Sequence, residues 1–522
     1  MTGTVEAEPR LSELSERERA DRFDRLQERL EPVWRLMRRN DPRESLVVVP
    51  SIAPPPGDMG SIVQAYEERL LFLLLLLRQP CLQLIYVTGR EVEQTIVDYY
   101  LALLPGVIPS QARARLHMIA ARDGSPRPLT TKLLERPRVL EAIRRRIPDR
   151  ERCHLVPFTT TPLERDLALC LGVPLYGADP RHLHFGTKTG CRRLFEDAGV
   201  AHPLGHEGVS DVDGAVNALA SMRAAKPGID RAIIKHNDGV AGRGNAVIDL
   251  RGLPSPGSPE EPAALHGRVE RMECENPGTD VREYLGRLAD GGGIVEEYLG
   301  GVELRSPSVQ LRITPLGEIE VLSTHDQLLG GRSGQTYLGC RFPADFGYAR
   351  EITSEATKVA EHLARAGVLG RFAVDFVVVR DTGGSWRPYA IELNLRKGGT
   401  THPFLTLQFL TDGAYDPQTA IFTAPSGREK HLVATDHLES EVLRGTSIDD
   451  LFDVAVRHRL HFDPARQAGV VFHMMSTLTE LGRTGMTAVG DTPEQAEAAY
   501  RRAERVLVED AEAPRETTLP QV

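Results

Sequence analysis

Short apolar runs alternate with amphipathic segments over the first 180 residues of the chain. Four of these runs have the length and composition of strands: residues 45–52, 82–89, 115–121 and 153–161. The segments between them carry helical patterns over residues 60–78, 90–104 and 130–146. Alternation of strands with helices predicts a mostly parallel sheet covered by helices. We therefore expect an α/β domain that ends near residue 180.

From residue 183 onward the pattern becomes strand–turn–strand. Residues 231–250 contain two strands around a glycine-rich loop, which favours a hairpin over a βαβ unit. The strands expected at 371–380 and 386–395 are joined by the turn "DTGG" and predict a second hairpin. The stretch 251–280 is rich in Pro, Gly and Glu and is expected to be an exposed insertion.

The two ends of the chain also carry regular patterns. Residues 11–39 have apolar side chains at helical spacing, and the last hundred residues predict two helices around a strand at 469–478. The predicted fold class is a multidomain protein of α/β and α+β domains. We expect five segments: a helical segment 1–43, an α/β domain 44–180, domains 181–300 (with an insertion near 251–285) and 301–425, and a small C-terminal α/β domain 426–522.

Composition narrows the class of protein. A chain of 522 residues is too long for one compact core, and its net charge of −10 argues against nucleic acid as a partner. The longest apolar run, residues 70–77, is too short to span a bilayer and predicts a buried helix. The charged N-terminus is unlike a secretory signal, and the six cysteines form no CxxC pair. We expect a cytoplasmic protein without a membrane partner.

The hairpin 371–395 carries a candidate metal site. Glu392 and Asn394 lie two residues apart, so they share one face of a strand, and Asp375 on the partner strand can face them. Two carboxylates and an amide carbonyl are ligands suited to Mg²⁺, with Mn²⁺ as an alternative. The other interpretation is a polar, solvated face of the sheet.

Two further stretches offer nucleotide-binding chemistry. Lys235 ends a strand and precedes "DGVAGRGN" (238–245), whose glycines can turn backbone N–H groups toward an anion. No helix follows this loop, so it is neither a Rossmann nor a Walker motif, and an ordinary hairpin turn is the alternative. The stretch "IVEEYLGGVE" (294–303) is a strand and linker with two acidic residues, Glu296 and Glu303, seven positions apart.

The order of these motifs resembles the ATP-grasp superfamily, in which two α+β subdomains clamp ATP. A closer resemblance is to the pheganomycin-type peptide ligases, which are ATP-grasp carboxylate–amine ligases. The motifs that carry it are "SPSVQLRI" (306–313), "STHDQLLGG" (323–331), "GCRFPADF" (339–346), "GRFAVDF" (370–376), "IELNLRKGGTTHPF" (391–404) and "GVVFHMMS" (469–476).

The resemblance assigns roles to individual residues. It implies phosphate binding by Lys188 and Lys235, with a flap made of Gly239, Gly242, Gly244 and Asn245. It implies an adenine-binding linker made of Glu296, Glu297, Tyr298 and Leu299, and a ribose ligand, Glu303. The implied magnesium ligands are Asp375, Glu392 and Asn394.

The resemblance also implies a reaction. ATP would phosphorylate a carboxylate, and an amine would then attack the acyl phosphate. The groups expected to stabilise its charge are Arg371, Arg396 and Lys397, with Arg312 as a rival, because Ala373 stands where related ligases often carry an arginine. The substrate side is expected to include Gly398, Gly399, Thr400, Thr401 and His402 together with His325 and Asp326, although the last two could instead stabilise a loop.

The expected substrates are an amino or guanidino acid as carboxylate donor and an amino acid or peptide as amine acceptor, in specialised metabolism. The oligomeric state stays open, with a homodimer as one alternative because many relatives dimerise. Two alternatives stay open: another ATP-grasp activity, such as a kinase or carboxylase-type ligase, and a nucleotide-binding regulatory protein without turnover.

Overall fold

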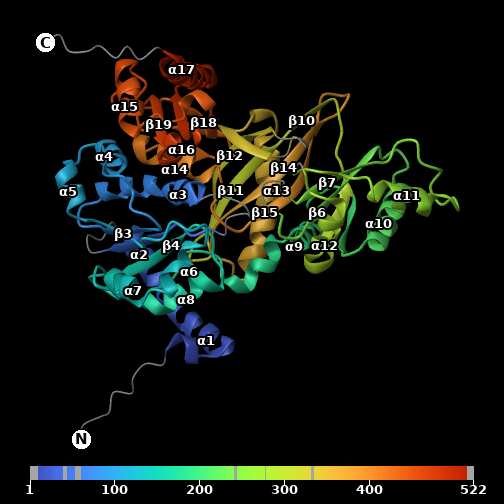
Figure 1. Cartoon of the computed structure of the whole chain (residues 1–522), viewed down its shortest axis with the longest axis horizontal. Helices are drawn as coiled ribbons and strands as arrows, with labels where there is room; N and C mark the ends of the chain where they lie inside the picture. Colours follow the sequence, from blue (N-terminus) through green and yellow to red (C-terminus); the bar gives the residue numbers. More distant parts are fainter. Residues whose placement is uncertain are drawn as a thin grey trace, which may run out of the picture. The chain divides into compact units, whose positions relative to one another are not determined.

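A computed structural model describes residues 10–38, 44–52, 60–239, 244–276, 278–330, 334 and 336–513 (Figure 1). They form two compact units, each described by itself. Unit 1 consists of Met1–Pro180, Thr401–Ala414 and Phe422–Val522. Unit 2 consists of Arg181–Thr400 and Tyr415–Ile421.

Unit 1 begins with a parallel sheet. The helices of this part are α1 (Glu16–Gln27), α2 (Leu30–Arg38), α3 (Gly60–Glu68), α4 (Gln94–Ala102), α5 (Pro109–Arg113), α6 (Leu129–Leu134), α7 (Pro137–Arg144) and α8 (Pro162–Leu171). The strands are β1 (Ser45–Val49), β2 (Gln83–Thr88), β3 (Leu116–Ala120) and β4 (Cys153–Pro157), in the order β3-β2-β1-β4. All pairings are parallel, as the alternation of strands and helices predicts.

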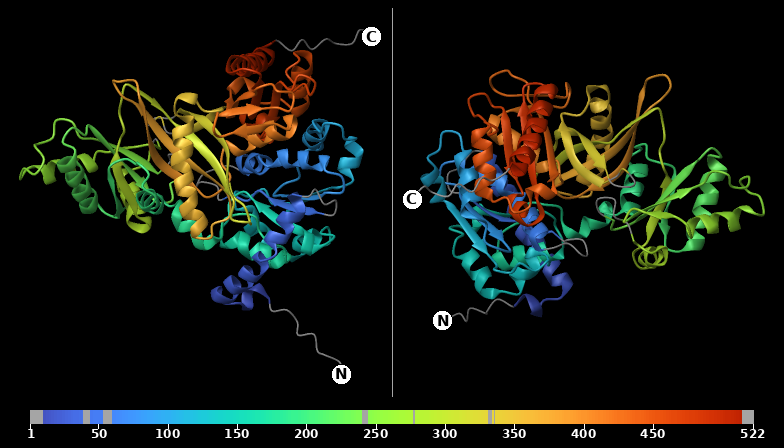
Figure 2. Two further views of the ribbon diagram at one scale, coloured as in Figure 1. Left: turned by 180° about the vertical axis from the view of Figure 1, so that it is seen from behind. Right: turned by 45° about the horizontal axis from the view of Figure 1, so that its top comes forward.

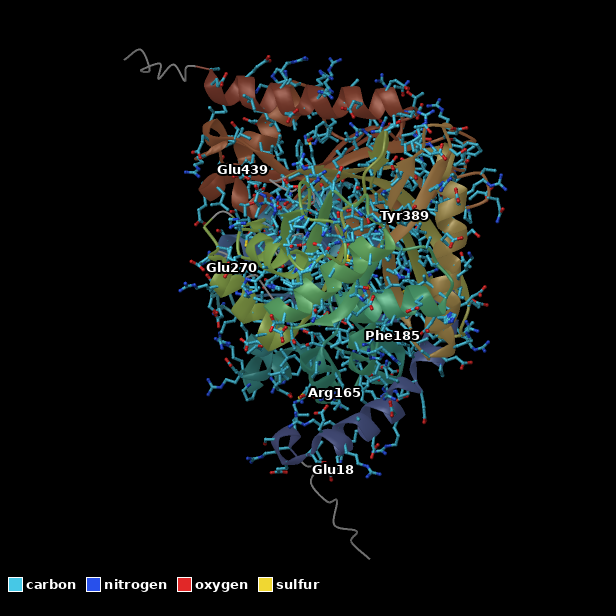
Figure 3. The ribbon with its side chains drawn as sticks, turned by 90° about the vertical axis from the view of Figure 1, so that its right-hand side faces the viewer. Glu18, Arg165, Phe185, Glu270, Tyr389 and Glu439 are labelled. Carbon is cyan, nitrogen blue, oxygen red and sulfur yellow. The ribbon has the colours of Figure 1, made fainter. Side chains whose placement is uncertain are left out.

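Both faces of this sheet are buried because helices cover each of them. Val47 and Val49 of β1 face a core shared with α6, α7 and α8, and Phe23 of α1 joins it. The alternate residues Leu46 and Val48 are also buried, on the face covered by α3 and α4 (Figure 1). Figure 3 shows Arg165 of α8 beside α1, where its guanidinium pairs with Glu16.

The rest of unit 1 comes from the C-terminal part of the chain. Its elements are α14 (Thr401–Thr411), β18 (His431–Glu439), α15 (Ile448–Arg457), β19 (Gly469–His473), α16 (Leu478–Leu481), β20 (Arg483–Gly490) and α17 (Pro493–Glu512). β20 pairs antiparallel with both β18 and β19. Tyr99 and Tyr100 of α4 join the two parts, because Phe472 N–H donates to the Tyr99 hydroxyl at 3.0 Å and the Tyr100 hydroxyl donates to the Phe472 carbonyl at 3.3 Å.

Unit 2 begins with an antiparallel sheet in the order β5-β9-β6-β7-β8. The bounds are α9 (Lys188–Asp197), β5 (Gly205–Val209), α10 (Val212–Ala225), β6 (Arg231–His236), β7 (Asn245–Asp249), α11 (Glu261–Val269), β8 (Glu273–Cys274), α12 (Val281–Gly291) and β9 (Gly293–Glu297). The stretch 251–280 was expected to be an exposed insertion, and residues 251–260 are exposed or half-buried as expected. The expectation is wrong for α11, because Leu265 and Val269 are fully buried in the core with α10.

The second sheet of unit 2 carries the predicted metal-binding hairpin. Its strands are β10 (Glu303–Arg305), β11 (Pro307–Ile313), β12 (Ile319–Gly330), β13 (Thr336–Phe342), β14 (Gly370–Arg380) and β15 (Trp386–Asn394). Within unit 2 the order is β15-β14-β11-β12-β13, and β10 also pairs with β14. The long helix α13 (Phe346–Arg365) packs on this sheet through one buried face (Figure 2). β16 (Ala414–Asp416) and β17 (Ile421–Thr423) form a short ribbon.

Two predicted helices differ in detail from the structure. Residues 11–39 are broken into a short 3-10 turn, α1 and α2, and the run 60–78 divides into α3 and the 3-10 helix η2 (Leu71–Arg78). The leucine-rich run is buried as expected, since every residue from Leu71 to Leu75 is at most 7% exposed. Within the described ranges, no helix is long and apolar enough to cross a bilayer.

Candidate active site

The hairpin of β14 and β15 brings two acidic residues together. Asp375 pairs directly with Glu392 in the ladder, and Ala373 pairs with Asn394. The Asn394 amide Nδ2 donates to Asp375 Oδ2 at 3.0 Å. The three predicted magnesium ligands therefore share one face of the sheet, and their carboxylate and amide groups fit a hard divalent cation.

The pKa values of Asp375 and Glu392 are shifted in opposite directions. Burial raises the pKa of Asp375 to about 6, and the neighbouring Glu392 adds to this effect. Burial would also raise the pKa of Glu392, but Lys188 and Arg396 outweigh it and hold that pKa below its ordinary value. Two adjacent half-buried carboxylates make a site in which added positive charge is favourable.

Both predicted phosphate-binding lysines are buried beside carboxylates. Lys188 is the first residue of α9, and its Nζ lies 2.8 Å from Glu392 Oε1. Lys235 lies near the end of β6, with its Nζ 2.6 Å from Glu296 Oε1. Arg192 of α9 contacts the other oxygen of Glu296 at 3.1 Å. The structure thus connects Lys188 to the metal-ligand candidates and Lys235 to the linker.

The glycine-rich loop joins two paired strands, as the sequence predicts. Lys235 lies opposite Asn245 in the register of β6 and β7. A Cβ atom on Gly244 would lie 2.9 Å from the Cα of Gly239, so this close approach requires glycine. Gly242 lies outside the described residues.

The predicted adenine-binding linker begins with the last two residues of β9, Glu296 and Glu297, and continues beyond the strand. Lys226 Nζ contacts Glu297 Oε2 at 2.6 Å, and the Tyr298 N–H donates to the Arg231 carbonyl at 3.0 Å. The Arg231 guanidinium lies over the Tyr298 ring, 4.2 Å from its centroid. The N–H of Tyr298 is thus engaged within the protein, while Leu299 continues the linker beyond it.

The predicted ribose ligand lies on the next strand. Glu303 of β10 pairs with Arg305 at 2.5 Å and with Arg380 at 3.3 Å. Its side chain is about one-third exposed. The carboxylate therefore lies at the accessible edge of the sheet.

Basic side chains cluster where β15 ends. Arg371 on β14 lies opposite Arg312 in the register with β11, and Arg312 Nε pairs with Glu320 at 2.5 Å. Burial and, to a smaller extent, the positive charge of Arg371 lower the pKa of Lys397 to about 7. Arg396 donates from Nη1 to the Lys397 carbonyl at 3.1 Å.

The loop after Lys397 is packed closely against the sheet. A Cβ atom on Gly399 would lie 2.5 Å from Cε1 of Tyr337, whereas one on Gly398 would meet no atom within 4 Å. The Gln310 amide donates to the Thr400 hydroxyl. Of the two glycines, Gly399 is the one whose missing side chain the packing requires.

The remaining substrate-side candidates, His325 and Asp326, lie on β12. His325 is fully buried, and its Nε2 lies 2.9 Å from Ser323 Oγ, while burial lowers its pKa to about 3. Asp326 accepts hydrogen bonds from the Tyr348 hydroxyl at 2.6 Å and from Asp345 N–H at 2.9 Å. Both residues have structural partners around α13 and β12.

Thr401 and His402 begin α14 and belong to unit 1. There His402 contacts Asp436 and His473, a group that the sequence reasoning did not assemble. The three residues are far apart in the chain and follow no spacing motif, so no local signal joined them.

Comparison with known proteins identifies the class. A family model described as "IQCH-like, ATP-grasp" matches residues 181–272 and 260–418, and one described as "PGM1 C-terminal domain" matches residues 450–503. Among solved structures, biotin carboxylase from Campylobacter jejuni has a TM-score of 0.53 at 12% identity, covering 90% of this chain and 95% of that one. The biotin carboxylase domain of the Hydrogenobacter thermophilus 2-oxoglutarate carboxylase has a TM-score of 0.52 at 13% identity, covering 90% and 94%. These likenesses show an ATP-grasp fold.

Curated relatives define the family more narrowly. The chain is 30% identical over 450 residues to the L-propargylglycine–L-glutamate ligase of Streptantibioticus cattleyicolor, covering 84% of this chain and 89% of that protein. It is 24% identical over 394 residues to the IQ motif-containing protein H of Danio rerio, covering 67% of this chain and 37% of that protein. The chain therefore belongs to the family of ATP-grasp ligases that includes the Streptantibioticus enzyme.

Proposed function

We propose that this protein joins the carboxylate of an amino or guanidino acid to the amine of an amino acid or peptide, with ATP converted to ADP and phosphate. The observation that carries the proposal is the convergence of Asp375, Glu392 and Lys188 on one face of the β14–β15 hairpin. The name of the Streptantibioticus relative supports amino acids as both substrates.

In the proposed first step, a carboxylate oxygen of the donor attacks the γ-phosphorus of ATP. A carbon–oxygen–phosphorus linkage forms, the bond to the β–γ bridging oxygen breaks, and ADP leaves. Positioning and neutralisation of charge matter most in such a transfer. Arg371, Arg396 and Lys397 are proposed to stabilise the negative charge of the acyl phosphate.

In the second step, the acceptor amine attacks the acyl carbon. The amide bond forms, inorganic phosphate leaves with its electron pair, and the nitrogen loses a proton. The loop at Gly398, Gly399 and Thr400 is proposed to hold the donor close to this centre. Enclosure of the site would limit loss of the acyl phosphate to water.

Asp375, Glu392 and the side-chain carbonyl of Asn394 are the residues proposed to hold Mg²⁺. When bound, the cation would neutralise phosphate oxygens and orient the γ-phosphoryl group. Lys188 and Lys235 would contact the same phosphates, exchanging their carboxylate partners for phosphate oxygens. Glu297, Tyr298 and Leu299 would place the adenine, and Glu303 the ribose.

A screen for ADP release tests the proposal. Carboxylate donors are paired with amine acceptors, and hits are confirmed by mass spectrometry of the product. We expect Glu392→Gln to abolish ADP release without unfolding the protein, because a neutral amide is a poor replacement for a carboxylate ligand. Glu361→Gln, on the exposed side of α13, is the matched control and should leave turnover unchanged.

Three experimental results would contradict the metal assignment or favour another function. Turnover by Glu392→Gln with normal magnesium dependence would remove the metal assignment. A phosphorylated or carboxylated product without an amide bond would favour the kinase or carboxylase-type alternative. ATP binding without ADP release in any donor–acceptor pair would favour a regulatory role.

A homodimer is also proposed, by analogy with the Hydrogenobacter thermophilus carboxylase domain, whose solved structure is a dimer. A cytoplasmic location is a separate proposal. Light scattering of the purified protein tests the first. A mass equal to one chain, 57.6 kDa, would contradict it.

A further inference from the structure

We propose that His402, Asp436 and His473 bind a divalent transition-metal ion, Zn²⁺ by preference. This site lies in unit 1 and uses none of the proposed magnesium ligands. The ion would link α14 to the strands β18 and β19. The proposed metal site does not depend on the proposed ligase activity.

The three residues come from three separate elements. His402 is the second residue of α14, Asp436 lies within β18, and His473 is the last residue of β19. Each is nearly inaccessible, with exposures of 3%, 2% and 4% respectively. Burial of three ionisable or polar side chains together is costly unless they bind one another or a cation.

Their ligand atoms form a nearly equilateral triangle. His402 Nε2 and His473 Nε2 are 3.0 Å apart, and they lie 3.1 Å and 3.0 Å from the same oxygen, Asp436 Oδ1. For bonds of about 2.0–2.1 Å, ligand atoms on one metal ion are about 2.9 Å apart at right angles and about 3.3 Å apart at tetrahedral angles. The observed edges fall between these values.

Hydrogen bonds alone cannot satisfy all three edges of this triangle. If both Nε2 atoms carry a proton, the two N–H groups oppose each other along the His402–His473 edge. If one does not, its lone pair faces the Asp436 carboxylate oxygen at hydrogen-bond distance. A cation between the three atoms removes the conflict, because every lone pair then points at positive charge.

Neighbouring residues hold the ligands in place. The Arg69 guanidinium pairs with Oδ2 of Asp436, so the carboxylate is oriented with Oδ1 toward the two histidines. The absence of a side chain at Gly485 leaves room for the His473 ring, because a Cβ atom there would collide with its Nε2 and Cδ2. Such outer contacts fix ligand orientation in metalloproteins.

The ligand set selects the class of metal. Two imidazoles and one carboxylate suit Zn²⁺ and other first-row transition ions, whereas Mg²⁺ prefers oxygen ligands only. Three protein ligands leave a position for water. Deep burial points to an ion acquired during folding.

Elemental analysis of the purified chain tests the proposal, with an affinity tag free of histidine. We expect about one zinc per chain in the wild type and at least a tenfold lower content in His473→Gln and Asp436→Asn. His154→Gln is the matched control. His154 is also 2% exposed and lies on a strand of unit 1, but outside the triangle, so its variant should retain the metal.

Refolding of the wild type with an added metal ion tests the site even if a variant is unstable. The wild type is unfolded in denaturant with 1,10-phenanthroline, a chelator that binds magnesium weakly, and refolded with Co²⁺ alone. We expect the visible absorption of a cobalt–imidazole site, and its loss in His402→Gln. An equal metal content in the wild type and in the variants of His402, Asp436 and His473 would mean an adventitious ion only. A metal-free wild type after refolding with Zn²⁺ or Co²⁺ would equally overturn the proposal.

Discussion

Lys397 is a buried cation whose ionisation opposes folding. Its pKa is lowered to about 7 by burial and by Arg371, against about 10.4 in an unfolded chain. Between these values the unfolded state binds more protons, so the free energy of unfolding rises with pH. The destabilisation caused by the charged Lys397 side chain is fully present below pH 7 and disappears as pH approaches 10.

We predict that Lys397→Met flattens this dependence. From pH 7 to 9 the wild type should gain up to about 1.4 kcal/mol of unfolding free energy per pH unit relative to the variant. Urea unfolding at several pH values measures the difference. Lys358→Met is the control, because Lys358 on α13 is 44% exposed and pairs with Glu355. Parallel pH profiles for wild type and Lys397→Met would show that Lys397 titrates normally.

At the scale of elements, the loop after β15 is shaped by its contact with β13. Alanine at position 399 would place a methyl group 2.5 Å from the Tyr337 ring, so the loop or the ring must shift. Gly399→Ala should therefore lower the free energy of unfolding by about 1–3 kcal/mol and reduce turnover.

Gly398, the neighbouring glycine, is the control position for this prediction. A Cβ atom at Gly398 meets nothing within 4 Å, so Gly398→Ala should change stability by less than about 0.5 kcal/mol. Chemical unfolding and ADP release are measured for both variants. Equal effects at the two positions would mean that contact with Tyr337 does not determine the loop.

The sequence predicted those elements whose signal is local. A two-residue period and the turn "DTGG" predicted a hairpin in which Asp375 can face Glu392 and Asn394, and the structure pairs Asp375 directly with Glu392. Periodicity could not distinguish the 3-10 helix η2 from an α-helix, because a continuous apolar run has no polar face. The abundance of Pro, Gly and Glu around 251–280 hid the buried face of α11, which includes Leu265 and Val269.

Long-range side-chain partners were beyond sequence reasoning. The pairing of Lys188 with Glu392, and of Lys235 with Glu296, depends on how sheets and helices pack in unit 2. His402 was assigned to the substrate loop because it follows that loop directly in the chain. The structure places it at the start of α14 in unit 1, where it contacts Asp436 and His473, and its substrate role stays a prediction.

At the scale of the whole molecule, unit 1 is assembled from stretches at both ends of the chain. α3 packs against the 3-10 helix η6 (Met475–Thr477), and α4 bonds Phe472 through its two tyrosines. We predict that a chain ending at residue 421 exposes this surface and becomes sensitive to protease within residues 60–104.

Limited proteolysis with mass spectrometry measures this sensitivity. A chain ending at residue 513 is the control, because it keeps α17 and every described element of unit 1. It should resist the protease as the full chain does. Resistance of the shorter chain would mean that residues 1–180 form a complete core without their C-terminal partners.

The separation of these stretches also matters during synthesis. Tyr100 leaves the ribosome long before Phe472, its partner 372 positions later. At about 5–20 residues per second, this leaves a wait of roughly 20–70 s. During that interval the aromatic surface of α4 has no C-terminal cover, so the nascent polypeptide is a natural client for chaperones that shield apolar segments.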